Sequence, residues 1–148
     1  MTYEKFSADN TALLLIDHQI GTMGWVKSIG FDEMKRNALM LANTARILKI
    51  PTVLTSSMEE YTQGPLLGEL QTILPTAFAE RVKRMGIVNA MDDENFAAAV
   101  NRFLELFRAA ELEQAFTKQN TISPSGKARS IRLTNLKLGY AQSIVLEI

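Results

Sequence analysis

The sequence contains no cysteine among its 148 residues, and it has a single histidine, His18. The missing cysteine excludes disulfides, thiolate metal sites and a cysteine nucleophile. Zinc sites in proteins are built mainly from cysteine and histidine, so a zinc site here would have to rely on carboxylates. We therefore expect no metal site and no cofactor.

An excess of charge of either sign is also missing, and so are long apolar runs. Lys and Arg number 16 and Asp and Glu number 16, which gives no reason to expect nucleic acid or a membrane surface as a partner. The apolar run Ala12 to Ile16 is far shorter than the roughly 20 residues that cross a bilayer. The N-terminus "MTYEKFSADN" lacks the pattern of a signal peptide, so we expect a cytoplasmic protein.

The order of apolar patterns predicts an α/β fold. The length suits one domain over residues 1–148. Thr11–Ile16 has the continuous apolar character of a strand in a parallel sheet, and "TVLTSS" (52–57) is β-branched. Between them, apolar residues at helical spacing predict a helix that Asp32 caps and that ends before Pro51. Strand, helix and strand with short links favour a right-handed crossover and a parallel sheet.

The later segments predict further elements of the same fold. Gly21 and Gly24 mark a loop after the first strand, and a short helix is expected between Pro65 and Pro75. Residues 78–84 predict a third strand. A long helix capped by Asp92 or Asp93 follows, with an apolar stripe at Phe96, Val100, Phe103, Phe107 and Ala110. A turn is expected at 123–126, and short β-like runs follow it. The predicted class is a three-layer α/β/α, Rossmann-like fold with a mostly parallel sheet.

The charge balance changes along the chain. Residues 1–100 carry 12 acidic and 9 basic groups, a net charge of −3, whereas residues 101–148 carry 4 acidic and 7 basic groups, a net charge of +3. A solvated, slightly basic surface accounts for such a run. A different origin of the last third is the alternative account, and we expect residues 101–148 to be atypical or truncated.

Polar side chains gather at the carboxyl ends of the predicted strands, where α/β sheets bind ligands. Asp17 ends the first strand, the hydroxyls of residues 55–57 end the second, and Arg84 ends the third. The structural alternatives are a loop aspartate bonded to nearby amides for Asp17 and a surface salt bridge for Arg84. The structural alternative for His18 is a loop or packing residue, and for Trp25 it is a core or interface residue.

Four motifs in order give the chain a family resemblance: "ALLLIDHQIG", "IPTVLTSSMEE", "GPLLGEL" and "VKRMGIVNAMDDENF". Over residues 8–100 they resemble the isochorismatase-like cysteine hydrolases, and the YcaC-like branch in particular. The resemblance implies a three-layer α/β/α fold, a homo-oligomer, and a catalytic set of an aspartate, a lysine or arginine, and a cysteine. Asp17 and Arg84 match the first two. In such a set the aspartate takes the thiol proton and the cation holds anionic groups.

The resemblance ends near Asn101, and the third catalytic residue is absent. No buried strand, glycine–valine turn or cysteine follows in residues 101–148. We therefore expect a hydrolase-like protein for a small amide or a related C–N or ether-containing metabolite, impaired by the missing thiol. Its expected catalytic residues are Asp17 and Arg84, and its expected substrate-binding residues are His18, Gln19, Trp25 and Ser56.

Four alternatives stay open. One is a non-catalytic protein on the same fold that oligomerises or binds a small ligand. A second uses a hydroxyl nucleophile among Thr117, Thr121, Ser123 and Ser125, which normally needs a histidine for activation. In a third, Asp17 is the general acid in hydrolysis of a vinyl ether, which needs a raised pKa that a nearby arginine opposes. The fourth is a marginally stable fragment whose incomplete sheet exposes an edge.

Overall fold

The structure, a computed structural model, describes residues 7–8, 11–103, 105–106, 132–138 and 141–147. The last two segments are described as backbone strands. A five-stranded sheet has the order β3-β2-β1-β5-β4. The strands β1 (Thr11–Ile16), β2 (Thr52–Ser57) and β3 (Val82–Arg84) run parallel. β5 (Ala141–Glu147) pairs antiparallel with β1, and β4 (Arg132–Leu138) pairs antiparallel with β5.

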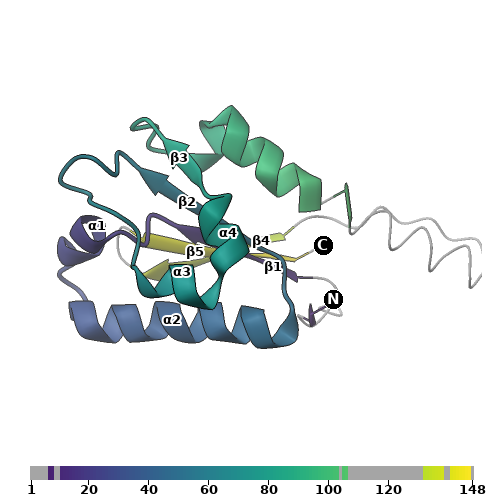
Figure 1. The fold of residues 1–148 in the computed structure, drawn as a ribbon, viewed down its shortest axis with the longest axis horizontal. Coiled ribbons are helices and arrows are strands. Elements are labelled where there is room, and N and C mark those ends of the chain that lie inside the picture. Colours follow the sequence, from purple (N-terminus) through teal and green to yellow (C-terminus); the bar gives the residue numbers. More distant parts are fainter. Residues whose placement is uncertain (1–6, 9–10, 104, 107–131, 139–140, 148) are drawn as a thin grey trace, which may run out of the picture.

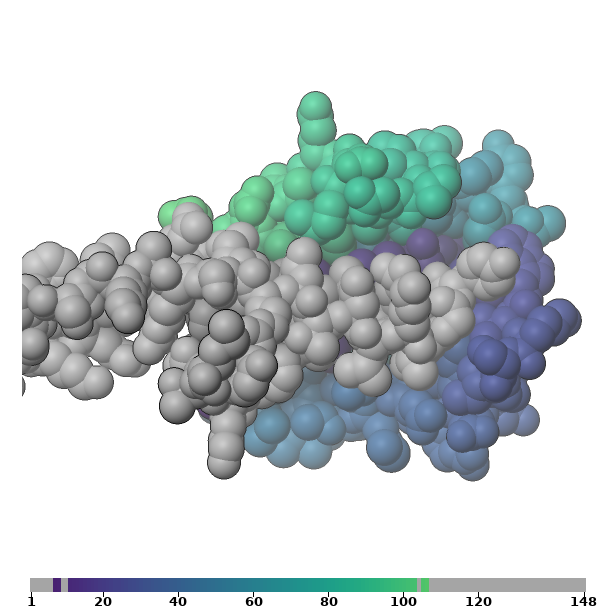
Figure 2. All heavy atoms as spheres, turned by 180° about the vertical axis from the view of Figure 1, so that it is seen from behind, coloured from purple at the N-terminus to yellow at the C-terminus, as the bar shows by residue number. Residues whose placement is uncertain are grey.

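Helices cover both faces of the parallel part of the sheet (Figure 1). On one face lie α1 (Ile20–Gly24), α2 (Phe31–Leu48), α3 (Glu69–Ile73) and α4 (Pro75–Ala79). On the other face, the 3-10 helix η2 (Ala90–Asp92) leads into a helix over residues 94–103. Seen from behind, the blue atoms of α2 and the green atoms of the later helix lie on opposite sides of the molecule (Figure 2). The predicted three-layer α/β architecture is confirmed.

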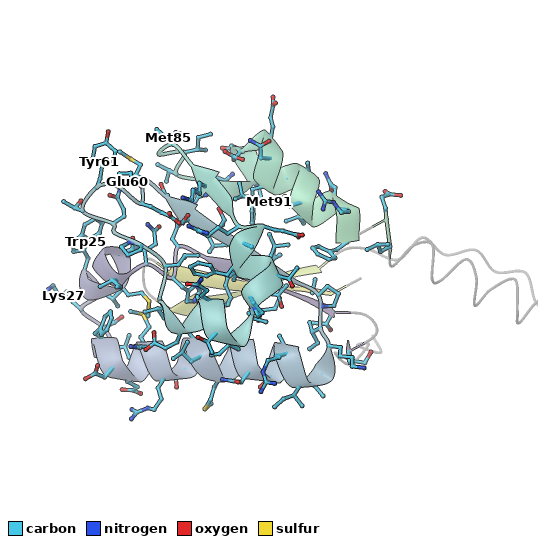
Figure 3. The ribbon with its side chains drawn as sticks, viewed as in Figure 1. Trp25, Lys27, Glu60, Tyr61, Met85 and Met91 are labelled. Carbon is cyan, nitrogen blue, oxygen red and sulfur yellow. The ribbon has the colours of Figure 1, made fainter. Side chains whose placement is uncertain are left out.

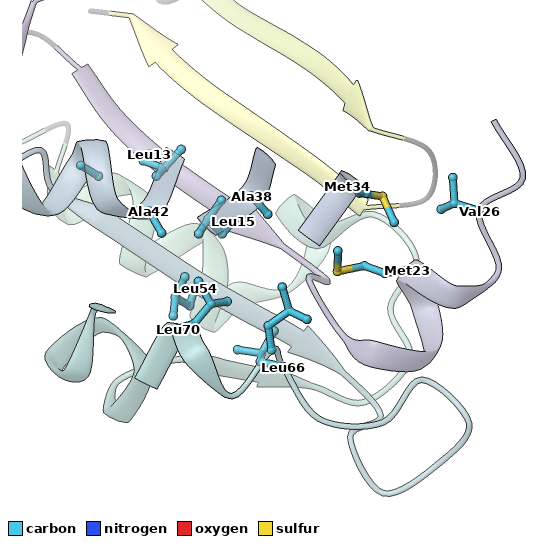
Figure 4. Close-up of a cluster of buried hydrophobic side chains, with 12 residues drawn as sticks. Leu13, Leu15, Met23, Val26, Met34, Ala38, Ala42, Leu54, Leu66 and Leu70 are labelled. Carbon is cyan, nitrogen blue, oxygen red and sulfur yellow. The ribbon is translucent and has the colours of Figure 1, made fainter. Parts of the chain in front are cut away.

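Two apolar cores arise because successive side chains of a strand point to opposite faces of the sheet. Leu13 and Leu15 of β1 pack with Leu54 of β2 against α2 and α3, in the cluster that Figure 4 shows. Leu14 and Ile16 pack on the other face, where Phe96 and Val100 of the later helix cover them. Every residue of β1 is buried, which accounts for its unbroken apolar run.

The helix α2 forms where the spacing predicts it. Met34, Ala38, Ala42 and Ala45 make its buried face, whereas Leu48 in the last turn is exposed. Gly30, not Asp32, is the N-cap residue; Asp32 and Glu33 lie in the first turn, where the helix dipole favours negative charge. At the other end Lys49 adopts a left-handed conformation with a φ of 55°, a common way to end a helix.

Several boundaries differ from expectation. The third strand covers only residues 82–84, because Pro75–Ala79 forms α4 with a proline in its first turn. The region around Gly21 and Gly24 is the short helix α1 and not a loop. Asp93 caps the later helix, since its Oδ1 accepts the N–H of Phe96 at 2.9 Å. The predicted stripe positions Phe107 and Ala110 and the turn at 123–126 lie outside the described residues.

The last two strands change the character of the sheet. β5 lies along the full length of β1, with Ile16 opposite Gln142 and Thr11 opposite Glu147. The parallel part of the sheet therefore ends at β1, and the hairpin adds two antiparallel pairings to a sheet that the sequence predicts to be mostly parallel.

Candidate functional site

Asp17 begins the candidate site at the carboxyl end of β1. Its backbone is left-handed, with a φ of 56°, a conformation that aspartate and asparagine adopt more readily than most residues. Its N–H donates to the carbonyl of Thr55 at 3.0 Å, which prolongs the contact with β2 by one residue. Its side chain is mostly buried, with 19% exposed. The local geometry therefore holds the carboxylate at the rim while leaving part of it accessible.

Arg84, the last residue of β3, reaches across β2 to this carboxylate. One terminal nitrogen (Nη2) forms an ion pair and a hydrogen bond with Asp17 Oδ1. Nε donates to the hydroxyl of Thr55 at 3.0 Å, and the other terminal nitrogen (Nη1) donates to the carbonyl of Ile87. The Thr55 hydroxyl in turn donates to the carbonyl of Val82 at 2.8 Å. The side chain of Arg84 is fully buried, so it is not in a surface salt bridge.

This arrangement gives the two charged groups different roles. The guanidinium is sealed inside the fold by its three acceptors, whereas the carboxylate keeps an accessible part. The chemistry offered at the surface is therefore that of a hydrogen-bond acceptor held by a cation behind it. Such a group can accept a proton, or an N–H or O–H of a ligand.

Gln19 is fully buried and bonds to two other segments. Its side-chain oxygen accepts the N–H of Ser57 at 2.8 Å, and its amide nitrogen donates to the carbonyls of Ser57, at 2.9 Å, and Gly64. Gly21 continues this contact, because its N–H donates to the carbonyl of Gln63 at 2.8 Å. Gln19 thus fixes the loop after β2 against the end of β1, and its predicted contact with a substrate stays a prediction.

His18 is also fully buried. Burial lowers its pKa to about 4, and a hydrogen bond with the backbone of Ile16 opposes this shift. The ring is therefore neutral near pH 7. Its carbonyl accepts the N–H of Leu67 at 2.9 Å. These features fit a packing residue, and a role of His18 in substrate binding stays a prediction.

Ser56 lies on the opposite face of the sheet from Thr55, because neighbouring strand residues alternate. It is fully buried, and its hydroxyl donates to Glu59 at 2.7 Å. Glu59 also binds Arg81 through two hydrogen bonds, at 2.7 and 3.1 Å, and pairs with Lys83 at 3.1 Å. The structure thus directs Ser56 into an ion-pair cluster and away from Asp17 and Arg84. A role of Ser56 in substrate binding stays a prediction.

The Glu59 cluster is a feature that sequence reasoning missed. The hydrogen bonds from Arg81 lower the pKa of Glu59 to about 2. Desolvation by burial opposes this shift, and the hydrogen bonds from Ser56 and Lys83 add to it. The available signal was a glutamate three residues after Ser56, with one cation just before the third strand (Arg81) and another within it (Lys83). The cluster holds β3 and the loop after β2 together.

Trp25, the remaining predicted site residue, is 46% exposed beside α1. Figure 3 shows it at the same end of the molecule as Tyr61, where the strands β1 and β2 end. Its exposure suits a contact surface, and a role in substrate binding stays a prediction.

Two cavities that described residues line lie elsewhere. They have volumes of about 360 and 330 Å³ and share Thr52, Ala77, Glu80 and Phe103. Thr52 begins β2, so both cavities open at the amino end of the sheet and not beside Asp17. Over the described residues, no group of three His, Asp or Glu side chains could hold a metal ion. No helix described here has the length and apolar character to cross a membrane.

Comparisons with known proteins identify relatives of this chain. Its sequence is 38% identical over 98 residues to the probable hydrolase YcaC of Escherichia coli (strain K12), a match that covers 66% of this chain and 46% of the relative. The chain is a homologue of YcaC. The predicted resemblance to the YcaC-like branch is thereby confirmed. A scan against protein-family models finds no match.

Solved YcaC structures share the fold. YcaC from Pseudomonas aeruginosa, bound to hexane-2,5-diol and covalent acrylamide, superposes with a TM-score of 0.65 at 39% identity, covering 69% of this chain and 50% of that one. YcaC from E. coli, described as an octameric hydrolase of unknown specificity, superposes with a TM-score of 0.64 at 37% identity, covering 69% and 49%. The chain thus spans about half the length of the YcaC proteins it matches.

Proposed function

We propose that this chain is a hydrolase-like protein that binds small amides, or related C–N or ether-containing metabolites, at Asp17, and that its turnover is strongly impaired. The observation that carries the proposal is the ion pair between Asp17 and Arg84 at the carboxyl edge of a YcaC-like sheet. The accessible carboxylate accepts the N–H of an amide. Arg84 orients the carboxylate through their hydrogen bond, and it acts from behind without touching the ligand.

Hydrolysis of an amide needs a nucleophile as well as a base. In a cysteine hydrolase, the carboxylate takes a proton from the thiol and the thiolate attacks the carbonyl carbon. The full sequence of this chain contains no cysteine. Asp17 therefore has no thiol to deprotonate, and the proposed consequence is binding without rapid turnover.

Two features of the structure argue against two of the alternatives. Oδ1 of Asp17 accepts a hydrogen bond from Arg84, so this oxygen is occupied as an acceptor and is not the donor that protonation of a vinyl ether needs. A hydroxyl nucleophile normally relies on a histidine that can reach it, and the side chain of His18 is fully buried. A non-catalytic ligand-binding protein on this fold is the second candidate, and the missing cysteine favours it.

A panel of small primary amides, such as acetamide and propionamide, tests the proposal. Binding is followed by calorimetry and hydrolysis by release of ammonia. We expect binding that Asp17→Asn weakens, with ammonia release close to that of buffer. Turnover that survives Asp17→Asn, or turnover blocked by a serine-directed reagent, would show that the site or the nucleophile is wrongly assigned.

Addition of a thiol gives a second test. The register pairs Ile16 with Gln142 and so places Ala141 next along β5, across from the end of β1. The P. aeruginosa YcaC structure holds covalent acrylamide. We expect Ala141→Cys to react with acrylamide faster than the control Met40→Cys on the exposed face of α2. Addition of Asp17→Asn to each cysteine variant should make their reaction rates equal. Equal rates already in the presence of Asp17 would contradict its role as a base.

We further propose that residues 1–148 work as one domain, in the cytoplasm, as a homo-oligomer. The octameric state of E. coli YcaC supports self-association. The pairing of β5 with β1 supports one folding unit, because it joins the last strand to the first.

A further inference from the structure

Six large apolar side chains are exposed around the edge of the sheet that carries Asp17. They come from the segments that follow β1, β2 and β3 in turn, and we call them the rim patch: Ile20, Trp25, Tyr61, Met85, Ile87 and Val88. Val88 is 97% exposed and Met85 is 82% exposed. Figure 3 shows Trp25, Tyr61 and Met85 toward the end of the molecule where the parallel strands end.

Exposed apolar side chains are ordinary when they are scattered, but a group on one edge marks a contact surface. Elsewhere in the described part of the chain, exposed residues such as Met40 and Ile47 lie on the outer side of α2. The rim patch differs from these because three separate loops contribute to it. Tryptophan and tyrosine are also the residues that most often dominate the binding energy of protein interfaces.

The rim patch is held in place by the site itself. Arg84, buried beneath it, donates to the carbonyl of Ile87, and the carbonyl of Arg84 accepts the N–H of Met58 at 3.0 Å. Gly86, between Met85 and Ile87, has a φ of +85° that residues with a side chain rarely adopt. The loop that presents Met85 and Val88 is thus fixed by the same guanidinium that orients Asp17.

Two charged residues of opposite sign lie at the same end of the molecule. Lys27 lies two residues after Trp25, and Glu60 directly precedes Tyr61. Both charged residues are exposed, and Figure 3 shows them beside the two aromatic residues. Neither forms an ion pair within the described residues. In an interface with two-fold symmetry every contact occurs twice: if one residue of the first copy touches a second residue of the partner, the second residue of the first copy touches the first residue of the partner. Lys27 of one copy can therefore face the partner's Glu60, and the reverse contact forms at the same time.

We propose that the rim patch is the surface through which two copies of this chain associate, and that the second copy closes the Asp17–Arg84 site. The inference rests on the homo-oligomer of the proposed function and adds where the copies meet. Apolar side chains supply the contact, and the Lys27–Glu60 pairs set its orientation. Closure removes water from the exposed part of Asp17, which strengthens any hydrogen bond that the carboxylate makes to a ligand.

Mass measurements on the full chain test this inference. The mass in solution is measured by light scattering and sedimentation over a range of protein concentrations, for the wild type, for Val88→Glu and Met85→Glu, and for the control Ile47→Glu on α2. We expect the rim variants to lose at least half of the wild-type mass and the control to keep it. A monomeric wild type, or a control that dissociates as readily as the rim variants, would overturn the proposal.

Charge reversal tests the orientation. Lys27→Glu and Glu60→Lys should each weaken self-association, because each places like charges opposite one another. The double variant should restore it, since the pairs form again with reversed sign. If the double variant associates no better than the single ones, the two-fold pairing is wrong.

Amide binding by the same variants keeps the two proposals apart. Asp17→Asn is expected to lose amide affinity at unchanged mass, which tests the site. Val88→Glu is expected to lose mass and to bind the amide more weakly, which tests closure by the partner. An amide affinity of Val88→Glu equal to that of the wild type would show that the second copy does not close the site.

Discussion

Replacement of Arg84 by methionine tests the energetic centre of the site. Arg84→Met keeps most of the side-chain volume and removes the donors that satisfy Asp17, Thr55 and Ile87. A hydrogen bond to a charged group contributes at least about 1.5 kcal/mol to stability, so the three bonds of Arg84 together contribute about 4.5 kcal/mol. Removal of one partner of a buried ion pair costs about 3–5 kcal/mol. Asp17 retains some contact with water, so we expect a loss of about 4 kcal/mol.

Urea unfolding followed by the fluorescence of the single tryptophan, Trp25, and by circular dichroism measures this loss. For a slope of about 2 kcal/mol per molar urea, the midpoint should fall by about 2 M. The control Lys35→Met removes an exposed ion pair with Glu69, and it should cost less than about 1 kcal/mol.

A double variant isolates the ion pair. Asp17→Asn with Arg84→Met should be less destabilised than the two single losses combined, because each single change leaves a mostly buried charge without its partner. If Arg84→Met loses no more stability than Lys35→Met, the ion pair does not hold the rim together and the reasoning is refuted.

Three further predictions concern the surroundings of the site. Gly21→Ala should lose about 1–3 kcal/mol of stability, because a Cβ there would stand 1.9 Å from the carbonyl oxygen of Thr62, whereas the matched change Gly24→Ala meets nothing within 4 Å and should unfold at the wild-type midpoint or slightly above it. Protonation of His18 is opposed by burial, and its pKa of about 4 lies below the ordinary 6.5, so the folded state binds fewer protons than the unfolded state between these values; stability should fall as the pH drops from about 6.5 to 4, and unfolding curves of His18→Gln should lack this dependence. The pKa of Glu59 is lowered from 4.5 to about 2, so its contribution is present above pH 4.5 and is lost as the pH falls through 2; Glu59→Gln should remove that part of the acid unfolding curve, and an unchanged curve would mean that Arg81 stabilises nothing there.

The parallel half of the fold could be predicted because its signals are local. The apolar run of β1, the helical spacing of Met34 to Ala45 and the β-branched β2 each fix one element, and the order of elements then fixes the topology. Because parallel strands end at one edge, the meeting of Asp17 and Arg84 followed from their places in the sequence alone.

The finer parts depend on contacts between distant segments. Nothing in the residues of β2 shows which hydroxyl faces Arg84. Neighbouring residues of a strand point to opposite faces of the sheet, and this is what separates Thr55 from Ser56. The bonds of Gln19 depend on where the loop after β2 runs. The pairing of β5 with β1 joins residues more than a hundred positions apart, and its direction and register are set by no local pattern.

The route that Arg84 takes across the sheet has a consequence for the residue beneath it. β3 and β1 are not neighbours, and the arginine crosses the whole width of β2 at Thr55 to reach its partner. A bulky side chain at position 55 would stand in that path. An alanine or valine there would leave Nε of Arg84 without its hydrogen-bond acceptor. Threonine is short and carries an oxygen, so natural variation at position 55 should be confined to threonine and serine wherever an arginine occupies position 84.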